Sequence, residues 1–182
     1  FMQKRNFDEM HDAEMLKKPP YEEGMGPWGA ADERAMIRPL LAFAKAKPDA
    51  PFLAVMFAFA PHHPYNAPDG VAPLISADAT LKKSQVRYFN SLNFADTAFG
   101  EILTALSEQG IVQNSILVVV GDHGEAFYEH AGNYNHPFFL YEENIHVPLM
   151  ISVDGARPQT IERVTSHVDI LPTVLDLLNL KH

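Results

Sequence analysis

Two kinds of apolar pattern alternate along the chain. Residues 52–60 form an unbroken apolar run between Pro51 and Pro61, and residues 115–120 form a second run rich in β-branched side chains. Runs of this length without polar alternation are typical of strands that are covered on both faces. Residues 147–153 are a further strand candidate. The pattern therefore predicts strands in these three places.

Helical spacing appears between and after these runs. The clearest helix is predicted within residues 81–110, and Gly110 is suited to end it. Its apolar positions fall three or four residues apart and form one stripe: Leu92, Ala95, Phe99, Ile102 and Leu106. Residues 32–47, with Asp32 as a candidate N-cap, and residues 168–180 predict two further helices.

Strands that alternate with helices indicate an α/β fold in which a mostly parallel sheet is flanked by helices. We expect residues 31–182 to hold the core strands and helices, and the Pro- and Gly-containing residues 1–30 to be irregular and peripheral. The loops after Ala60 and Val120 would then lie at one edge of the sheet. Ligands of open α/β folds bind outside the carboxyl ends of the strands, so the sequence points to a site at that edge.

Composition excludes several classes of function. Fourteen Lys and Arg residues stand against twenty-three Asp and Glu, and the net charge of -9 argues against nucleic acid as a partner. The chain has no cysteine, so a disulfide, a cysteine zinc site and a thiol nucleophile are excluded within it. No apolar run approaches the ~20 residues that a membrane-spanning helix needs.

The segment Gly-Asp-His-Gly at residues 121–124 carries the first candidate chemistry. A carboxylate and an imidazole side by side after a buried strand form a compact pair of ligands for a divalent cation, and the flanking glycines permit a tight turn. Alternatively, Asp122 caps the next segment and His123 is a surface residue. Because a catalytic zinc usually takes three protein ligands, others would be needed. Within this chain the candidates are His62, His136 and Glu125.

A second group of candidates lies in loops. His62 and His63 follow the first predicted strand within Pro-His-His-Pro, where one of them could hydrogen-bond an anionic ester or protonate a leaving oxygen. A histidine in a proline-rich loop is also commonly structural. Trp28 lies in a loop, where it either lines a substrate pocket or packs that loop onto the domain. We treat His63 and Trp28 as candidate substrate-binding residues.

Five sequence blocks occur in an order that resembles the sulfatase family. They lie at residues 61–65, 88–100, 121–125, 141–149 and 166–173. The family belongs to the alkaline phosphatase-like superfamily, which also holds lipoteichoic acid synthases and phosphoethanolamine transferases. The resemblance implies an alkaline phosphatase/sulfatase-like α/β fold. It also implies that residues 1–182 are the C-terminal part of a single sulfatase-like domain, incomplete at its N-terminal side.

The resemblance also implies roles for individual residues. Asp122 and His123 would bind a divalent cation, which is calcium, zinc, manganese or magnesium in different branches of the family. His62 would contact the transferred group or the leaving oxygen, and His136 would be the third active-site residue. Pro137 follows His136 where many members of the family have glycine.

The function implied by the resemblance is a metal-dependent sulfuric ester hydrolase that acts on a small-molecule, glycan or lipid ester. One alternative is a phosphoglycerol or phosphoethanolamine transferase, which acts on phosphate esters at a membrane reached through segments upstream of this chain. Another is a non-catalytic domain that keeps the fold. The implied location is extracytoplasmic.

The family's nucleophile, a formylglycine or a threonine, belongs to an N-terminal part that these 182 residues do not match. We therefore predict that the 182-residue chain alone releases no product from an aryl sulfate or aryl phosphate. The measurement is the release of a fluorescent phenol, and turnover above that of a heat-denatured sample would contradict the prediction.

Overall fold

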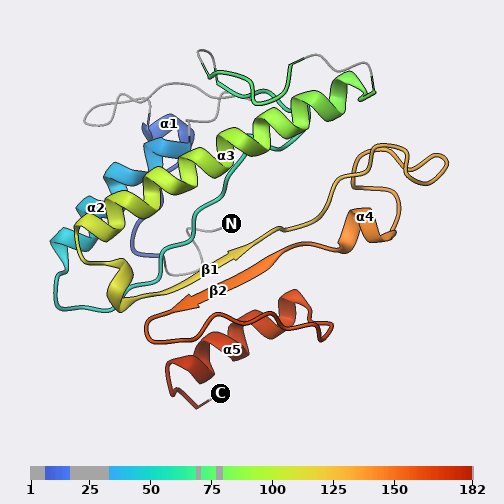
Figure 1. Cartoon of the computed structure of the whole chain (residues 1–182). Coiled ribbons are helices and arrows are strands. Elements are labelled where there is room, and N and C mark those ends of the chain that lie inside the picture. Colours follow the sequence, from blue (N-terminus) through green and yellow to red (C-terminus); the bar gives the residue numbers. More distant parts are fainter. Residues whose placement is uncertain (1–6, 17–32, 69–70, 77–79, 182) are drawn as a thin grey trace.

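The computed structural model describes residues 7–16, 33–68, 71–76 and 80–181. Figure 1 shows a long helix above a pair of strands, with a second helix below them. The α-helices are α1 (Ala13–Leu16), α2 (Ile37–Ala46), α3 (Lys83–Glu108), α4 (Glu142–Ile145) and α5 (Ile170–Leu177). The 3-10 helices are η3 (Glu33–Met36), η4 (Val112–Asn114) and η5 (His167–Asp169), and the strands are β1 (Ile116–Val120) and β2 (Leu149–Val153).

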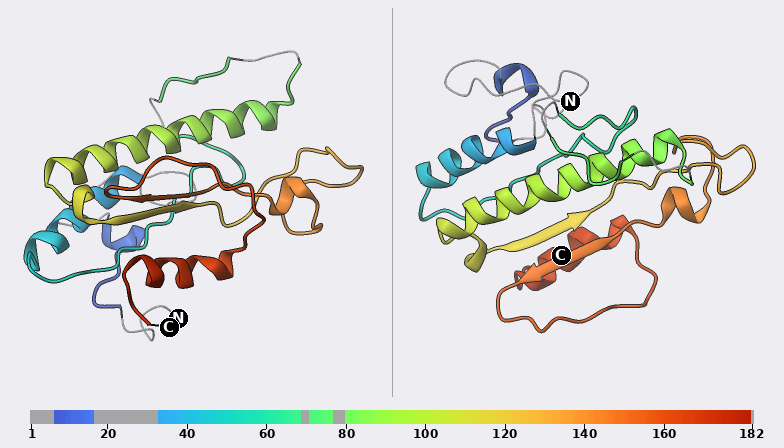
Figure 2. Two further views of the ribbon diagram at one scale, coloured as in Figure 1. Left: turned by 60° about the horizontal axis from the view of Figure 1, so that its bottom comes forward. Right: turned by 45° about the horizontal axis from the view of Figure 1, so that its top comes forward.

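The strands β1 and β2 form the one ladder within the described residues. Both were predicted, but they pair antiparallel, with Val118 opposite Ile151, so the expectation of a mostly parallel sheet is wrong for this pair. The reason is that the chain turns back after β1 through a long loop and α4, and β2 then returns along β1 in the opposite direction. The α/β character is confirmed, since the views of Figures 1 and 2 place α3 and α5 on opposite sides of the strands.

Residues 52–60 do not form the predicted strand covered on both faces. They run as an extended segment with no ladder partner within the described part of the chain. Leu53 is 77% exposed, and only Ala60 at the end of the run is buried. The apolar pattern identified an extended segment correctly, but burial requires neighbouring strands and helices that the pattern does not specify.

A buried carboxylate holds the end of this extended segment. Glu33 Oε1, in η3, accepts hydrogen bonds from the backbone N–H groups of Phe59 at 2.8 Å and Ala60 at 2.7 Å. Glu33 is only 6% exposed. The two donors would otherwise lack a strand partner, so Glu33 satisfies them and sets the point from which the His62 loop departs.

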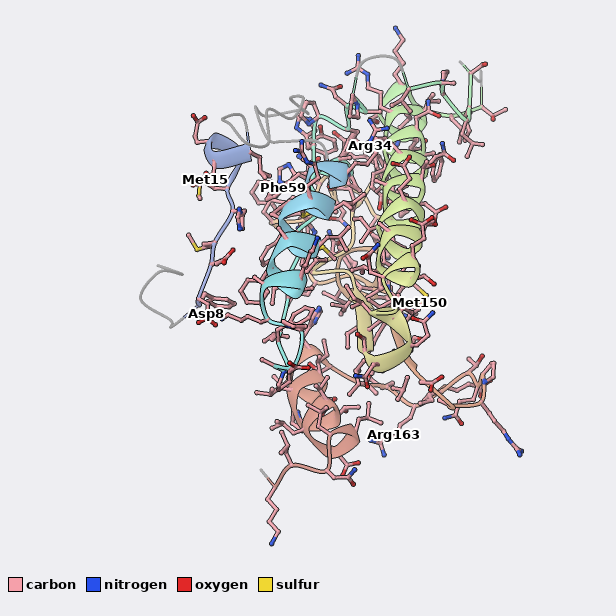
Figure 3. All side chains as sticks on the ribbon, turned by 90° about the vertical axis from the view of Figure 1, so that its left-hand side faces the viewer. Asp8, Met15, Arg34, Phe59, Met150 and Arg163 are labelled. Carbon is pink, nitrogen blue, oxygen red and sulfur yellow. The ribbon has the colours of Figure 1, made fainter. Side chains whose placement is uncertain are left out.

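The adjacent Arg34 ties η3 to α3. Its guanidinium lies 5.4 Å from the ring centroid of Phe94 and 3.9 Å from Glu101. Figure 3, in which Arg34 and Phe59 are labelled, shows η3 and α2 running alongside α3. The exposed ion pair with Glu101 adds little stability, whereas the contact with the Phe94 ring orients the Arg34 side chain.

Helix α3 begins and ends close to where the sequence predicts. Gly110 has φ 70°, its N–H donates to Ser107 O, and the N–H of Ile111 donates to Leu106 O. This is a Schellman motif, in which the left-handed residue is normally glycine. The buried stripe is rotated from the predicted one and consists of Ser91, Phe94, Ala98, Ile102 and Leu106. Phe94 and Ala98 pack on Ala60, which joins α3 to the extended segment.

The shorter helices follow their sequence signals. Pro39 in α2 and Pro172 in α5 are both third residues, where proline has no intrahelical hydrogen bond to remove. Asp32, the predicted cap, lies outside the described residues. In the described part of residues 1–30, predicted to be irregular, α1 forms one turn with Leu16 buried. Among the described helices, none combines the length and the apolar character that crossing a bilayer requires.

Removing the Glu33 carboxylate should destabilise the fold. We predict that Glu33→Ala lowers the free energy of unfolding by about 1–3 kcal/mol, because two backbone donors lose their acceptor. Urea unfolding followed by circular dichroism measures this. The control is Glu101→Ala, which removes an exposed acid from the same region and should change stability by less than about 1 kcal/mol. If the two variants lowered the free energy of unfolding equally, the buried hydrogen bonds of Glu33 would contribute no more stability than an exposed ion pair.

Candidate active site

The turn after β1 is shaped by close contact with α4. The N–H of Gly124 donates to Asn144 O at 2.8 Å, and the N–H of Gly121 donates to Pro148 O at 3.2 Å. A Cβ added to Gly124 would overlap the backbone carbonyl of Glu143. Only glycine fits so close to another backbone, so the turn and α4 are locked together.

Asp122 and His123 present two donor atoms to the same point. Asp122 Oδ2 lies 3.6 Å from His123 Nε2, and the Asp122 side chain is 87% exposed. Two ligands, each ~2.1 Å from a tetrahedral ion, are about 3.4 Å apart, so the observed spacing suits two corners of a coordination sphere.

The other atoms of both side chains are held in place by the backbone. Asp122 Oδ1 accepts the N–H of His123 at 2.9 Å, and His123 Nδ1 lies 2.8 Å from Gly124 O. With a proton on Nδ1, the lone pair of Nε2 faces the candidate metal position. This is the arrangement by which metal-binding histidines are usually oriented.

Two further histidines lie next to this pair. The His136 ring stacks on the His123 ring with centroids 3.9 Å apart, and the His62 ring meets His136 edge to face at 5.7 Å. His62 Nδ1 lies 2.8 Å from His63 O, which sets the plane of the His62 ring. Three imidazoles from two distant parts of the sequence thus converge beside Asp122.

The Glu125 carboxylate pairs with the His136 ring. Glu125 Oε2 is 3.3 Å from His136 Nδ1, and the Glu125 side chain is 5% exposed. Glu125 Oε1 is buried and has no hydrogen-bond partner within the described residues. The Glu125 carboxylate therefore pairs with one ring nitrogen of His136 and holds the imidazole in place.

A hairpin-like loop over residues 126–135 returns the chain to the site. Phe127 and Tyr134 form an isolated antiparallel bridge, and the N–H of Asn135 donates to Ala126 O at 3.1 Å. Asn144 Nδ2, in α4, donates to Asn135 O at 2.9 Å. These bonds bring His136, eleven residues after Glu125, back beside it.

A polar network holds this loop on α4. Asn133 Nδ2 donates to Glu143 Oε1 at 2.6 Å and to Asn144 Oδ1 at 2.7 Å, while His130 Nδ1 lies 2.7 Å from Glu143 Oε1. Burial would raise the pKa of Glu143, but hydrogen bonds from His130, its own backbone and Asn133 outweigh this and lower the pKa. Glu143 therefore stays ionised and keeps both donors.

The candidate residues of the sequence analysis divide into three groups. The structure brings together Asp122, His123, His136 and His62. It turns His63 toward Tyr65, with ring centroids 5.2 Å apart. Trp28 lies outside the described residues.

Among the described residues, Asp122 and His123 do not form part of a complete set of metal ligands. Across residues 7–16, 33–68, 71–76 and 80–181, no three His, Asp or Glu side chains come together in a group that could hold a metal ion. Glu125, a candidate third ligand by sequence, instead pairs with His136. The donor chemistry of Asp122 and His123 fits one side of a cation, and the rest of its coordination sphere is not supplied by the described residues.

Sequence reasoning missed the residues that position the site. Tyr65, Asn135 and Asn144 received no role, although Tyr65 and Asn144 lie within blocks that suggested the family and Asn135 directly precedes His136. No local pattern marks Asn144, which is buried although it follows two glutamates in the sequence. His167 Nε2 lies 2.8 Å from Gly121 O and so braces the turn that carries Asp122 and His123.

Comparison with known proteins finds sulfatases among the relatives of this chain. A family model described as Sulfatase matches residues 1–180. An ulvan-active sulfatase of Formosa agariphila is 28% identical over 190 residues, which covers 90% of this chain and 37% of that protein. Arylsulfatase K of Canis lupus familiaris is 35% identical over 98 residues, which covers 53% of this chain and 18% of that protein. The chain therefore spans well under half the length of these relatives.

A solved structure shows the same fold. A protein of the alkaline phosphatase superfamily from Vibrio parahaemolyticus superposes with a TM-score of 0.68, and the match covers 96% of this chain and 39% of that one. The sequence identity is 19%, so this likeness concerns the fold alone. It confirms the expected alkaline phosphatase-like class.

Adding one methyl group at Gly124 should disturb the candidate metal ligands. We predict that Gly124→Ala destabilises the protein by about 1–3 kcal/mol, because the new Cβ overlaps the α4 backbone and must push the turn away. It should also weaken zinc binding, since Asp122 and His123 move with the turn. Thermal unfolding and calorimetric zinc titration measure the two effects.

The matched control is Gly100→Ala on α3, where a Cβ meets nothing within 4 Å. That change should stabilise the helix by roughly 0.5–1 kcal/mol and leave zinc affinity unaltered. If Gly124→Ala behaved like Gly100→Ala, the close contact with α4 would not shape the site.

Proposed function

The chain belongs to the sulfatase family, and on that premise we propose that it supplies the cation-binding and anion-contacting part of a metal-dependent sulfuric ester hydrolase. The observation that carries the proposal is the convergence of Asp122, His123 and His136 with His62. A carboxylate can bind the cation and imidazoles can hydrogen-bond the oxygens of an anionic ester, so the four side chains suit a site for a charged ester.

We propose that Asp122 and His123 hold the divalent cation. In each side chain, a backbone hydrogen bond on one polar atom orients the other polar atom toward the cation. A bound divalent cation in such a site would withdraw charge from the ester oxygens and favour attack at sulfur. Zinc, calcium, manganese and magnesium all remain compatible with one carboxylate and one imidazole.

The proposed role of His136 and His62 is to contact the oxygens of the ester. His136 Nδ1 lies 3.3 Å from the buried carboxylate of Glu125, which fixes the ring and leaves its other nitrogen to contact the ester. His62, in the loop after the extended segment, is the proposed proton donor to the leaving alcohol oxygen. The attacking hydroxyl is assigned to no residue of this chain.

Sulfate is the proposed group rather than phosphate. Relatives named as sulfatases support this choice, among them an ulvan-active sulfatase and an endo-4-O-sulfatase of Bacteroides thetaiotaomicron. A glycan or small-molecule sulfate ester is the proposed substrate class, and with a glycan substrate the proposed location is extracytoplasmic. Because phosphate and sulfate esters share tetrahedral geometry and negative charge, direct comparison of the two esters is the deciding measurement.

Loss of the Asp122 carboxylate should abolish tight metal binding. We predict that Asp122→Ala lowers zinc affinity on the order of 100-fold, because one of two described ligands is removed and its charge is lost. Isothermal titration and metal content by mass spectrometry measure this. Asp154→Ala is the control, because it removes another exposed aspartate just after a strand and should leave zinc binding unchanged. Equal zinc affinity in wild type and Asp122→Ala would refute the proposed metal site.

Hydrolysis is tested on the full encoded protein that contains this chain. It should release 4-methylumbelliferone from the sulfate ester faster than from the phosphate ester, and Asp122→Ala should remove both activities. Faster hydrolysis of the phosphate ester would replace the proposed substrate class. Metal binding without turnover of either ester would support the non-catalytic alternative.

A further inference from the structure

Tyr65 is a buried residue that contacts both loops of the candidate site, the loop that carries His62 and the loop that carries His136. The residue is 3% exposed, and its ring packs against Tyr88 of α3 at 5.5 Å and Phe127 at 5.7 Å between centroids. It belongs to the same loop as His62, while Phe127 belongs to the loop that carries His136. A single buried side chain therefore contacts both parts of the site.

The Tyr65 hydroxyl reaches the residue next to His136. It donates to Asn135 Oδ1 at 3.3 Å. The backbone of Asn135 is held on both sides, by Ala126 O and by Asn144 Nδ2, and its φ of 60° is one that asparagine tolerates better than most residues. The bond from Tyr65 thus ends on a fixed point, one peptide away from the His136 imidazole.

The backbone of Tyr65 is equally well fixed to His62. The N–H of Tyr65 donates to His62 O at 2.8 Å, which closes a tight turn, and Tyr65 has φ 61°. A bulky side chain seldom adopts this left-handed conformation, and it persists only where surrounding contacts impose it. The aromatic packing of Tyr65 supplies those contacts.

We infer that Tyr65 is a positioning residue that sets the spacing of the His62 and His136 imidazoles through its turn to His62 and its hydrogen bond to Asn135. This inference rests on the proposed function, in which those two imidazoles contact one sulfate group. The observed edge-to-face approach of the two rings at 5.7 Å is the geometry that Tyr65 maintains.

The Tyr65 hydroxyl keeps its proton at neutral pH. Burial, followed by the negative charge of Glu125, raises the pKa of Tyr65. A group whose pKa is raised remains protonated below its ordinary value, so the hydroxyl stays a donor toward Asn135 at neutral pH.

The chain contains a matched control for the hydroxyl. Tyr88 belongs to the same aromatic cluster, with ring centroids 5.5 Å from Tyr65 and 5.2 Å from Phe127. Tyr88→Phe therefore removes a hydroxyl from the cluster but leaves the bond to Asn135 intact. Tyr65→Phe keeps the ring and removes that bond. Asn135→Gly removes the acceptor and tolerates the left-handed backbone.

The experiment uses the full chain with ring-labelled histidine and nuclear magnetic resonance. In wild type a cross-peak between the His62 and His136 ring protons is expected. Tyr65→Phe and Asn135→Gly should weaken that cross-peak, and Tyr88→Phe should preserve it. Titration with sodium sulfate should shift the ring resonances of both histidines. The sulfate affinity should be about fivefold lower in Tyr65→Phe than in wild type, with no further loss when Tyr65→Phe is combined with Asn135→Gly.

Each outcome decides the inference. An unchanged cross-peak in Tyr65→Phe, an equal loss in Tyr88→Phe, or a wild type without the cross-peak would overturn it. If the cross-peak responds to Tyr65→Phe but sulfate shifts neither ring, the proposed anion site fails while the positioning role stands. Asn135→Gly provides the same readout should Tyr65→Phe fold poorly.

Discussion

The close contact between Gly124 and the backbone of α4 is the constraint on which the candidate site depends. It leaves no room for a Cβ and is reinforced by the hydrogen bond from Gly124 to Asn144. Because Gly124 directly follows His123, the contact decides where the two candidate metal ligands point. Because α4 also anchors Asn135 and Asn133, the same helix decides where His136 returns. One short helix thus couples both groups of side chains.

Carboxylates lie next to imidazoles at two places in the candidate site. The chain carries a net charge of -9, and an anionic ester would be repelled unless positive charge were concentrated locally. Glu125 beside His136 and Asp122 beside His123 each place a carboxylate next to an imidazole. The first pair holds the His136 ring in place, and the second is the proposed cation site. In the proposed site, a cation held by Asp122 and His123 would supply the positive charge that an anionic ester requires.

The structure brings the candidate residues Asp122, His123, His136 and His62 together, but not by the parallel sheet edge that the sequence predicted. The sheet-edge argument required parallel strands, one of them at residues 52–60, yet that segment is unpaired within the described residues and the observed ladder is antiparallel. His62 nevertheless reaches His136. It does so because Glu33 holds the end of the extended segment and Tyr65 fixes the loop that follows. Neither contact has a local sequence pattern, since each joins residues more than twenty-five positions apart.

The sequence by itself determined the elements whose causes are local. The periodicity of residues 81–110, with Gly110 at the end, predicted α3, and the β-branched run before Gly121 predicted β1. It also determined which residue types could bind a cation, because Asp122 and His123 are neighbours in the chain. Only the tertiary structure decided that Glu125 pairs with His136, and that Tyr65 connects the two histidine loops. Those roles depend on distances between remote segments, which arise from packing and hydrogen bonding after the chain has folded.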